Sequence, residues 1–243
     1  MQAELAMGDY LIDRYPIRPA RQTDSSFRRL LNPAPELQLH GITSSGRSSI
    51  ETYITSQFKK AHQANITEFM PWLLATKCMG GTSAVVGIRA AYATPLFLEQ
   101  YLSEPLEEML GQFEGEPVHR SKVAEIGNLV ATQTGASQLL FVLLPELLQQ
   151  VGFEWVVFTA TSGVQGILNK LEIGFHVICE ARLKKLPQQS QANWGNYYSN
   201  KPKVIAANIA EAVEQLQHRR LPNFISSYFA NRVSALSRAF REG

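Results

Sequence analysis

Hydrophobic residues recur along this 243-residue chain with two different periods. Runs with every second residue apolar, or with consecutive β-branched and aromatic residues, predict strands, whereas apolar residues three or four positions apart predict helices. The expected strands cover residues 37–42, 71–77, 82–92, 122–132, 154–159 and 175–183. The expected helices cover residues 48–61, 95–111, 136–151, 163–173, 203–217 and 222–241.

The order of these elements predicts an α/β fold. Helices separate most of the strands, but a Met79-Gly80-Gly81 turn joins two of them directly, which is typical of a hairpin. The run from Glu154 to Thr159 is apolar almost throughout and predicts a central strand buried on both faces. At the start of the first helix, Ser48 and Glu51 have the spacing of a capping box. We therefore expect a mixed β-sheet with helices on both faces.

Three segments are distinguished by their patterns. Residues 1–35 contain Arg and Pro with little periodicity and are expected to form an N-terminal arm. Residues 36–202 carry the alternating strands and helices and are expected to form the core. Residues 203–243 are expected to form a C-terminal helical extension.

Composition narrows the class of protein. A formal charge of +2 gives no reason to expect nucleic acid as a partner. The two cysteines and five histidines are not grouped at metal-ligand spacing, so neither a metal site nor a tightly bound cofactor is expected. The N-terminus has acidic residues and no apolar signal region, and no apolar run approaches the roughly 20 residues of a membrane span. The chain is therefore predicted to be cytoplasmic.

Several motifs occur in an order that carries a family resemblance. They are Phe69-Met70-Pro71-Trp72-Leu73-Leu74, Gly87-Ile88-Arg89-Ala90-Ala91, Leu96-Phe97-Leu98-Glu99-Gln100-Tyr101-Leu102, Glu125-Ile126-Gly127-Asn128-Leu129, Trp155-Val156-Val157-Phe158-Thr159-Ala160-Thr161 and Trp194-Gly195-Asn196-Tyr197-Tyr198. Over about residues 45–210, the chain resembles the bacterial thermostable hemolysin family. That family name describes a red-cell phenotype and does not define a chemistry.

The element order is also similar to that of the GNAT acyltransferases. Within that superfamily, the chain resembles the acyl-homoserine-lactone synthases. The resemblance is carried by Arg89 two residues after Gly87, then by Thr94-Pro95 and a helix, and then by a strand with Glu125. The resemblance implies transfer of an acyl chain from acyl carrier protein to a small-molecule amine. The synthases' N-terminal Arg, Trp and Asp pattern is not evident here, so the resemblance does not extend to S-adenosylmethionine as the substrate.

Glu125 is the first candidate for chemistry, because it interrupts an otherwise apolar strand and a buried carboxylate is costly unless it is paired or used. It either takes a proton from an attacking amine or forms a structural ion pair with Arg89. Arg89 has the fork geometry to hold a carboxylate or phosphate. Asn128 reaches the same site if Gly127 marks a β-bulge, and otherwise bonds the sheet edge.

A second group of candidates lies at the ends of strands. Gln133, Gly135 and Ser137 join a strand to a helix start, where backbone N–H groups bind anions; in GNAT enzymes the corresponding turn binds the pyrophosphate of coenzyme A. An ordinary capped helix is the alternative. Thr159 and Thr161 close the buried strand at its carboxyl end, where ligands of α/β sheets bind, although Thr161 also suits a helix cap.

Aromatic and basic residues mark the last part of the chain. Trp194, Tyr197 and Tyr198 either cover an acyl pocket or pack over the edge of the sheet. The final helix carries Arg232, Arg238 and Arg241 beside an apolar stripe. It either packs on its own domain or contacts an anionic membrane or an acidic carrier protein.

Three functional hypotheses follow. The first is an acyltransferase that moves a fatty acyl group from an acyl-carrier-protein or coenzyme A thioester to an amine. The second is a membrane-active, hemolysin-like protein that acts through the basic C-terminal helix. The third is an acyltransferase fold that binds acyl ligands without turnover.

Overall fold

The core of the protein is one mixed β-sheet. The computed structural model describes residues 34–133 and 135–242. The strands are β1 (Glu36–His40), β2 (Trp72–Cys78), β3 (Gly81–Ala90), β4 (Val123–Ala131), β5 (Trp155–Ala160), β6 (His176–Glu180) and β7 (Lys203–Asn208), in the sheet order β1-β2-β3-β4-β5-β7-β6. The β4–β5 pair is parallel and the other neighbouring pairs are antiparallel. The mixed sheet and the β2–β3 hairpin confirm the predictions, whereas the expected N-terminal arm falls almost wholly outside the described residues.

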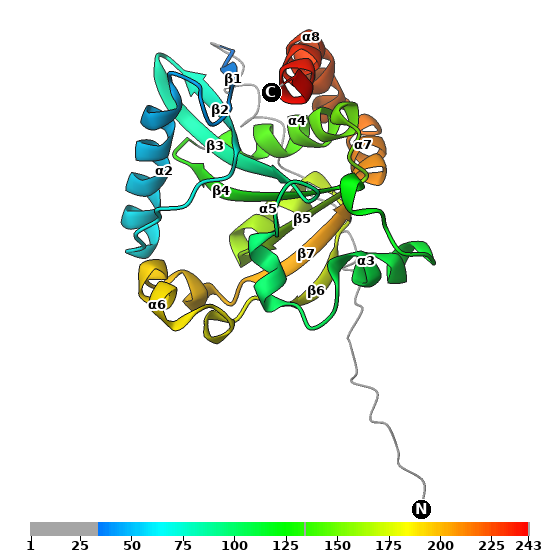
Figure 1. Cartoon of the computed structure of the whole chain (residues 1–243). Helices are drawn as coiled ribbons and strands as arrows, with labels where there is room; N and C mark the ends of the chain where they lie inside the picture. Colours follow the sequence, from blue (N-terminus) through cyan, green and yellow to red (C-terminus); the bar gives the residue numbers. More distant parts are fainter. Residues whose placement is uncertain (1–33, 134, 243) are drawn as a thin grey trace, which may run out of the picture.

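Helices cover both faces of this sheet (Figure 1). They are α2 (Arg47–His62), α3 (Leu106–Glu114), α4 (Ala136–Val151), α5 (Ser162–Leu171), α6 (Gln188–Gln191), α7 (Ile209–Gln217) and α8 (Arg220–Glu242), with 3₁₀ turns η1 (Phe97–Tyr101), η2 (Arg120–Lys122), η3 (Leu183–Lys185), η4 (Ala192–Trp194) and η5 (Tyr197–Asn200). Successive residues of β2 point to opposite faces. Leu74 therefore belongs to the core cluster that includes residues of α4, α5, α7 and α8, and Leu73 belongs to the cluster that includes residues of α2.

The C-terminal helix α8 packs on its own domain. Ile225, Phe229 and Val233 are buried in the same core cluster as the apolar residues of α4. Phe224 and Tyr228 stay exposed on the outer side. Among the described helices, none combines the length and apolar character needed to cross a membrane.

The predicted helix over residues 203–217 is wrong in its first six residues. Residues 203–208 form strand β7 between β5 and β6, and α7 begins at Ile209, where the Asn208 side chain accepts from the Glu211 backbone N–H at 3.1 Å. An apolar run such as Val204–Ala207 fits a buried strand and a buried helix equally, and only its two strand neighbours decide between them. The sheet therefore extends beyond residue 202.

The predicted capping box at Ser48 and Glu51 is also wrong. The N-cap of α2 is Gly46, without a side-chain cap, and Glu51 pairs instead with Arg47 at 2.6 Å. The Arg47 guanidinium also donates to the carbonyl oxygens of Met70 (2.8 Å) and Pro71 (2.7 Å). This buried arginine therefore ties the start of α2 to the segment that precedes β2.

Candidate active site

A cavity of about 210 Å³ opens where β4 and β5 separate. Residues Val123–Ile126 of β4 pair with Trp155–Phe158 of β5. Beyond these residues, the carboxyl-terminal ends of the two strands do not pair with each other. Gly127, Asn128 and Leu129 from β4 and Thr159 from β5 line the opening. Ligands of open α/β sheets bind at such a position.

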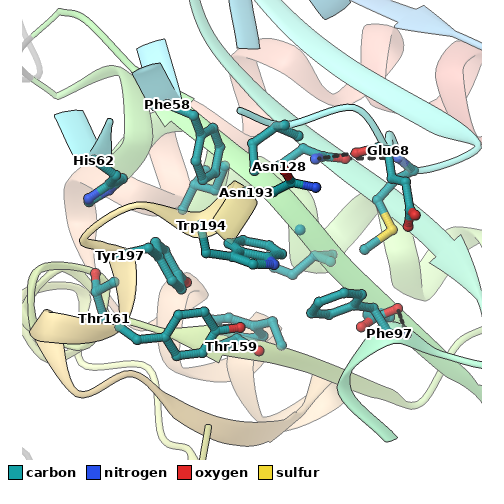
Figure 2. A pocket seen from close by; sticks show the side chains of 18 of the residues that line it. Phe58, His62, Glu68, Phe97, Asn128, Thr159, Thr161, Asn193, Trp194 and Tyr197 are labelled. Carbon is teal, nitrogen blue, oxygen red and sulfur yellow. Dashed lines mark hydrogen bonds between the residues drawn. The ribbon is translucent and has the colours of Figure 1, made fainter. Parts of the chain in front are cut away.

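The cavity walls are mostly apolar or aromatic. They are formed by α2, the segment before β2, η1, the start of α5 and the segment from α6 to η5 (Figure 2). The main apolar and aromatic lining residues are Phe58, Ile66, Met70, Phe97, Tyr101, Ile126, Phe158, Val164, Trp194, Tyr197 and Tyr198.

A β-bulge in β4 shapes the opening. Val85 pairs with Val130 and Gly87 pairs with Gly127, so Asn128 and Leu129 together oppose the single residue Val86. Asn128 takes a left-handed conformation, with φ of 49°. The bulge predicted from Gly127 is confirmed, with the extra residue immediately after the glycine. It turns the Asn128 side chain out of the regular alternation and toward the cavity.

The Asn128 amide holds the segment before β2 against the bulge. Its Oδ1 accepts from the Met70 backbone N–H at 2.8 Å, and its Nδ2 donates to the Glu68 carbonyl oxygen at 3.3 Å (Figure 2). The Met70 side chain lies over Gly87 and Gly127, where a Cβ on either glycine would meet it at 2.6 Å. The segment from Glu68 to Met70 is thus docked on the sheet by shape and by hydrogen bonds.

Replacing Asn128 with glycine tests this docking. Glycine keeps the left-handed conformation but leaves the Met70 N–H without its acceptor, so we expect a loss of about 1–2 kcal/mol in the free energy of local opening. Hydrogen exchange of the Met70 amide should then accelerate about tenfold, since 1.4 kcal/mol is a factor of ten. Asn128→Asp keeps the acceptor for the Met70 N–H but loses the donor to the Glu68 carbonyl oxygen, so it should accelerate exchange of the Met70 amide less than the glycine variant does. An unchanged Met70 exchange rate in the glycine variant would contradict this role.

The Glu125 carboxylate is buried and fully engaged. One oxygen accepts from the Phe97 backbone N–H at 3.0 Å and the other from the Leu98 N–H at 2.9 Å, at the start of η1. Arg89 Nη1 lies 3.7 Å from the same carboxylate. Burial raises the pKa of Glu125, and the two N–H donors and Arg89 oppose that rise. Glu125 therefore fixes η1, which carries Phe97 and Tyr101 into the cavity wall.

Arg89 lies opposite Glu125 on the neighbouring strand and lines the cavity. Besides its ion pair, Nη1 donates to the Pro95 carbonyl oxygen at 3.3 Å, while Nε is buried without a hydrogen-bond partner among the described residues. The pair that the sequence suggested therefore forms, and it lies in the cavity wall.

Aromatic rings from η1 and from residues 192–200 form the roof of the cavity. Trp194 contacts Phe97 with ring centroids 5.4 Å apart, Tyr197 at 5.4 Å and Tyr198 at 5.7 Å. The Tyr198 and Tyr101 hydroxyls are hydrogen-bonded to each other. Burial raises the pKa of Tyr101 and of Tyr198, so both phenols stay neutral at physiological pH.

Backbone hydrogen bonds join this roof to the carboxyl-terminal end of α2. The Asn65 N–H donates to the Asn193 carbonyl oxygen at 2.7 Å, and the Asn196 N–H donates to the His62 carbonyl oxygen at 2.8 Å. Gly195 lies between these bonds with φ of 49°. These bonds join two segments about 130 residues apart in the sequence beside one cavity.

The structure brings eight of the predicted site residues to the cavity. Glu125, Asn128, Arg89, Thr159, Thr161, Trp194, Tyr197 and Tyr198 all line it. Thr161 also accepts from the Val164 backbone N–H at 3.5 Å and so caps α5 as well. Gln133, Gly135 and Ser137 lie at the end of β4 and the start of α4 and do not line this cavity.

Sequence reasoning missed several residues of the wall. Phe58 and His62 come from α2, and Glu68 and Met70 come from the segment after it. Met70 belongs to the motif of residues 69–74 but was not among the candidate site residues. The signals in the sequence were that motif and the lack of periodicity in residues 63–68, between a predicted helix and a predicted strand.

Solved structures with a similar fold include acyl-homoserine lactone synthases and an N-acyl amino acid synthase. FeeM, an N-acyl amino acid synthase from uncultured soil microbes, matches with a TM-score of 0.52 and 13% identity, covering 79% of this chain and 98% of that one. BjaI, a CoA-dependent acyl-homoserine lactone synthase solved with SAM and isopentyl-CoA, matches with a TM-score of 0.51 and 8% identity over 76% and 89%. The AHL synthase LasI matches with a TM-score of 0.50 and 10% identity over 72% and 90%.

These matches show that the fold of the chain is GNAT-like, and at identities of 13% and 8% they show the fold alone. The family model for thermostable hemolysin matches residues 41–213, so the chain belongs to the thermostable hemolysin family. A comparison with curated protein sequences found no match.

Proposed function

We propose that this protein is an acyltransferase that moves a fatty acyl group from a thioester to an amine. The observation that carries the proposal is the largely apolar cavity at the separated ends of β4 and β5, beside the bulge at Asn128. An apolar cavity that is rimmed by a few polar groups suits a hydrocarbon chain with a polar reacting end. The solved structures of the same fold include a CoA-dependent synthase and an N-acyl amino acid synthase.

The proposed reaction is an aminolysis of the thioester. The amine nitrogen bonds to the thioester carbonyl carbon, the carbon–sulfur bond breaks, and the departing thiolate takes up one proton while the new amide nitrogen loses one. The aromatic roof and the walls of the cavity exclude water, which otherwise competes for the acyl group. Glu125 and Asn128 act as positioning residues, because their polar atoms hold η1 and the segment before β2 in place.

The proposed donor is an acyl group on coenzyme A or on acyl carrier protein. With coenzyme A, the expected phosphate site is the turn that leads into α4, with Gln133, Gly135 and Ser137, because Gly135 leaves the helix N-terminus without a side-chain cap. With acyl carrier protein, this turn is not needed, because the phosphopantetheine arm has no adenosine diphosphate.

The test is thiol release from acyl thioesters by the purified full-length chain. Decanoyl-CoA and decanoyl-acyl carrier protein are offered with 2-phenylethylamine and with free amino acids, and the amide product is identified by mass spectrometry. Filling the cavity with Thr159→Trp should lower kcat/KM at least tenfold, about 1.4 kcal/mol in the transition state, whereas Thr52→Trp on the exposed face of α2 should not. Tight binding of the thioester without turnover would favour a non-catalytic acyl-binding protein, and neither turnover nor binding would end the proposal.

A further inference from the structure

Glu68 is a carboxylate of the cavity wall that no structural role explains. Its backbone carbonyl is held by Asn128, but within residues 34–133 and 135–242 no cation lies at ion-pair distance from its side chain. The residue is exposed, lines the cavity and is labelled in Figure 2. Its position is nevertheless fixed, since Asn128, Gly87 and Gly127 dock the segment that carries it.

The charge balance of the lining residues points to a cationic ligand. The lining contains two carboxylates, Glu68 and Glu125, and one permanent cation, Arg89. Arg89 is paired with Glu125 at 3.7 Å, which leaves the negative charge of Glu68 unbalanced. This negative charge would repel the carboxylate of a ligand that enters the cavity and would attract an ammonium group.

The aromatic rings of the same cavity favour the same ligand class. Trp194, Phe97 and Tyr197 line the cavity together with Glu68. The faces of aromatic rings attract ammonium groups, most strongly in the case of tryptophan. A carboxylate and aromatic rings that line one cavity are therefore complementary to an amine that arrives in its protonated form.

We propose that Glu68 binds the amine acceptor of the acyl transfer as an ammonium ion and accepts its proton. This inference rests on the proposed function and adds the acceptor class, a primary amine without a neighbouring carboxylate. Glu68 takes one proton from the ammonium, and the free amine then attacks the thioester carbonyl carbon. The proton that the new amide nitrogen loses goes to the departing thiolate, so Glu68 gives its own proton to water and the cycle closes. Glu125, with both oxygens engaged by N–H donors, is not available for this step.

Binding of a cation that cannot react tests the site apart from catalysis. Titration calorimetry of the full-length chain with trimethyl(2-phenylethyl)ammonium should show binding that weakens about tenfold in Glu68→Gln, the effect of one charge-assisted interaction. Glu68→Asp and the exposed-carboxylate control Glu104→Gln should stay within about threefold of the unsubstituted protein. Equal affinity in Glu68→Gln and the unsubstituted protein, or absence of binding to both, would overturn the inference.

Kinetics then separate this inference from the proposed function. With 2-phenylethylamine as the acceptor, Glu68→Gln should raise the KM for the amine about tenfold and leave the KM for decanoyl-CoA unchanged. It should also lower kcat, because the glutamine amide cannot take the proton of the ammonium. Acyl transfer with an unchanged amine KM in Glu68→Gln would overturn the role of Glu68 and leave the acyltransferase standing. Glu68-dependent binding of the quaternary ammonium without acyl transfer to any amine would support the cation site and contradict the acyltransferase.

Discussion

Replacing Glu125 with glutamine is expected to lower the free energy of unfolding by about 3 kcal/mol and to abolish most of the proposed acyl transfer. The amide keeps one acceptor oxygen, but its NH₂ group must face either the Phe97 or the Leu98 N–H, which is also a donor. The buried side chain also loses the charge that faces Arg89. Since η1 then loses its anchor, Phe97 and Tyr101 no longer hold the cavity wall. Urea unfolding and thiol release measure the two effects.

The positioning role that the structure gives Glu125 and the role of base that the sequence suggested predict different outcomes. If it positions η1, stability and activity fall together. If it is the base, Glu125→Gln folds with unchanged stability and is inactive, and that result would contradict the positioning role. Glu108→Gln, an exposed carboxylate on α3, is the matched control and should change the free energy of unfolding by less than about 0.5 kcal/mol.

Replacing Gly195 with alanine should open the roof of the cavity. Its φ of 49° disfavours a residue with a Cβ, and that Cβ would lie 2.1 Å from the His62 carbonyl oxygen and 2.7 Å from the Gln63 carbonyl carbon. Backbone strain and overpacking together are expected to cost about 3 kcal/mol of stability. Because the backbone of α2 cannot yield by that distance, residues 192–200 must move away, and binding of a long-chain acyl thioester should weaken at least tenfold, or about 1.4 kcal/mol.

The control for this variant separates the φ penalty from the close contact. Gly80 also has a positive φ, of 80°, but a Cβ there would meet nothing within 4 Å. Gly80→Ala should therefore cost only about 1–2 kcal/mol and leave binding of the acyl thioester unchanged. If Gly195→Ala is no more destabilising than Gly80→Ala and binds the thioester normally, the contact with α2 does not hold the roof.

The cavity is assembled from parts that stabilise one another. Glu125 holds η1, Asn128 holds the segment before β2, and backbone hydrogen bonds hold residues 192–200 against α2. In each case a polar group on one element forms hydrogen bonds with backbone groups of a segment that does not pair with a strand of the sheet. A change in any of the three is therefore expected to alter both stability and ligand binding.

Much of the local structure was determined by the sequence itself. The Met79-Gly80-Gly81 turn specified the hairpin, and the period of the apolar residues specified most of the strands and helices. A carboxylate in an apolar strand and a glycine after it identified Glu125 and the bulge. These signals are local, because steric preference and burial of one face act over a few residues.

Other features were decided only by the tertiary structure. Residues 203–208 became a strand because two other strands flank them. Arg47, the partner of Glu51, is held at the start of α2 by the carbonyl oxygens of Met70 and Pro71. Glu68 joined the cavity because Asn128, 60 residues further along the chain, fixes its backbone. Contacts between distant segments depend on which surfaces meet after the sheet forms, and the periodicity of a single segment carries no information about them.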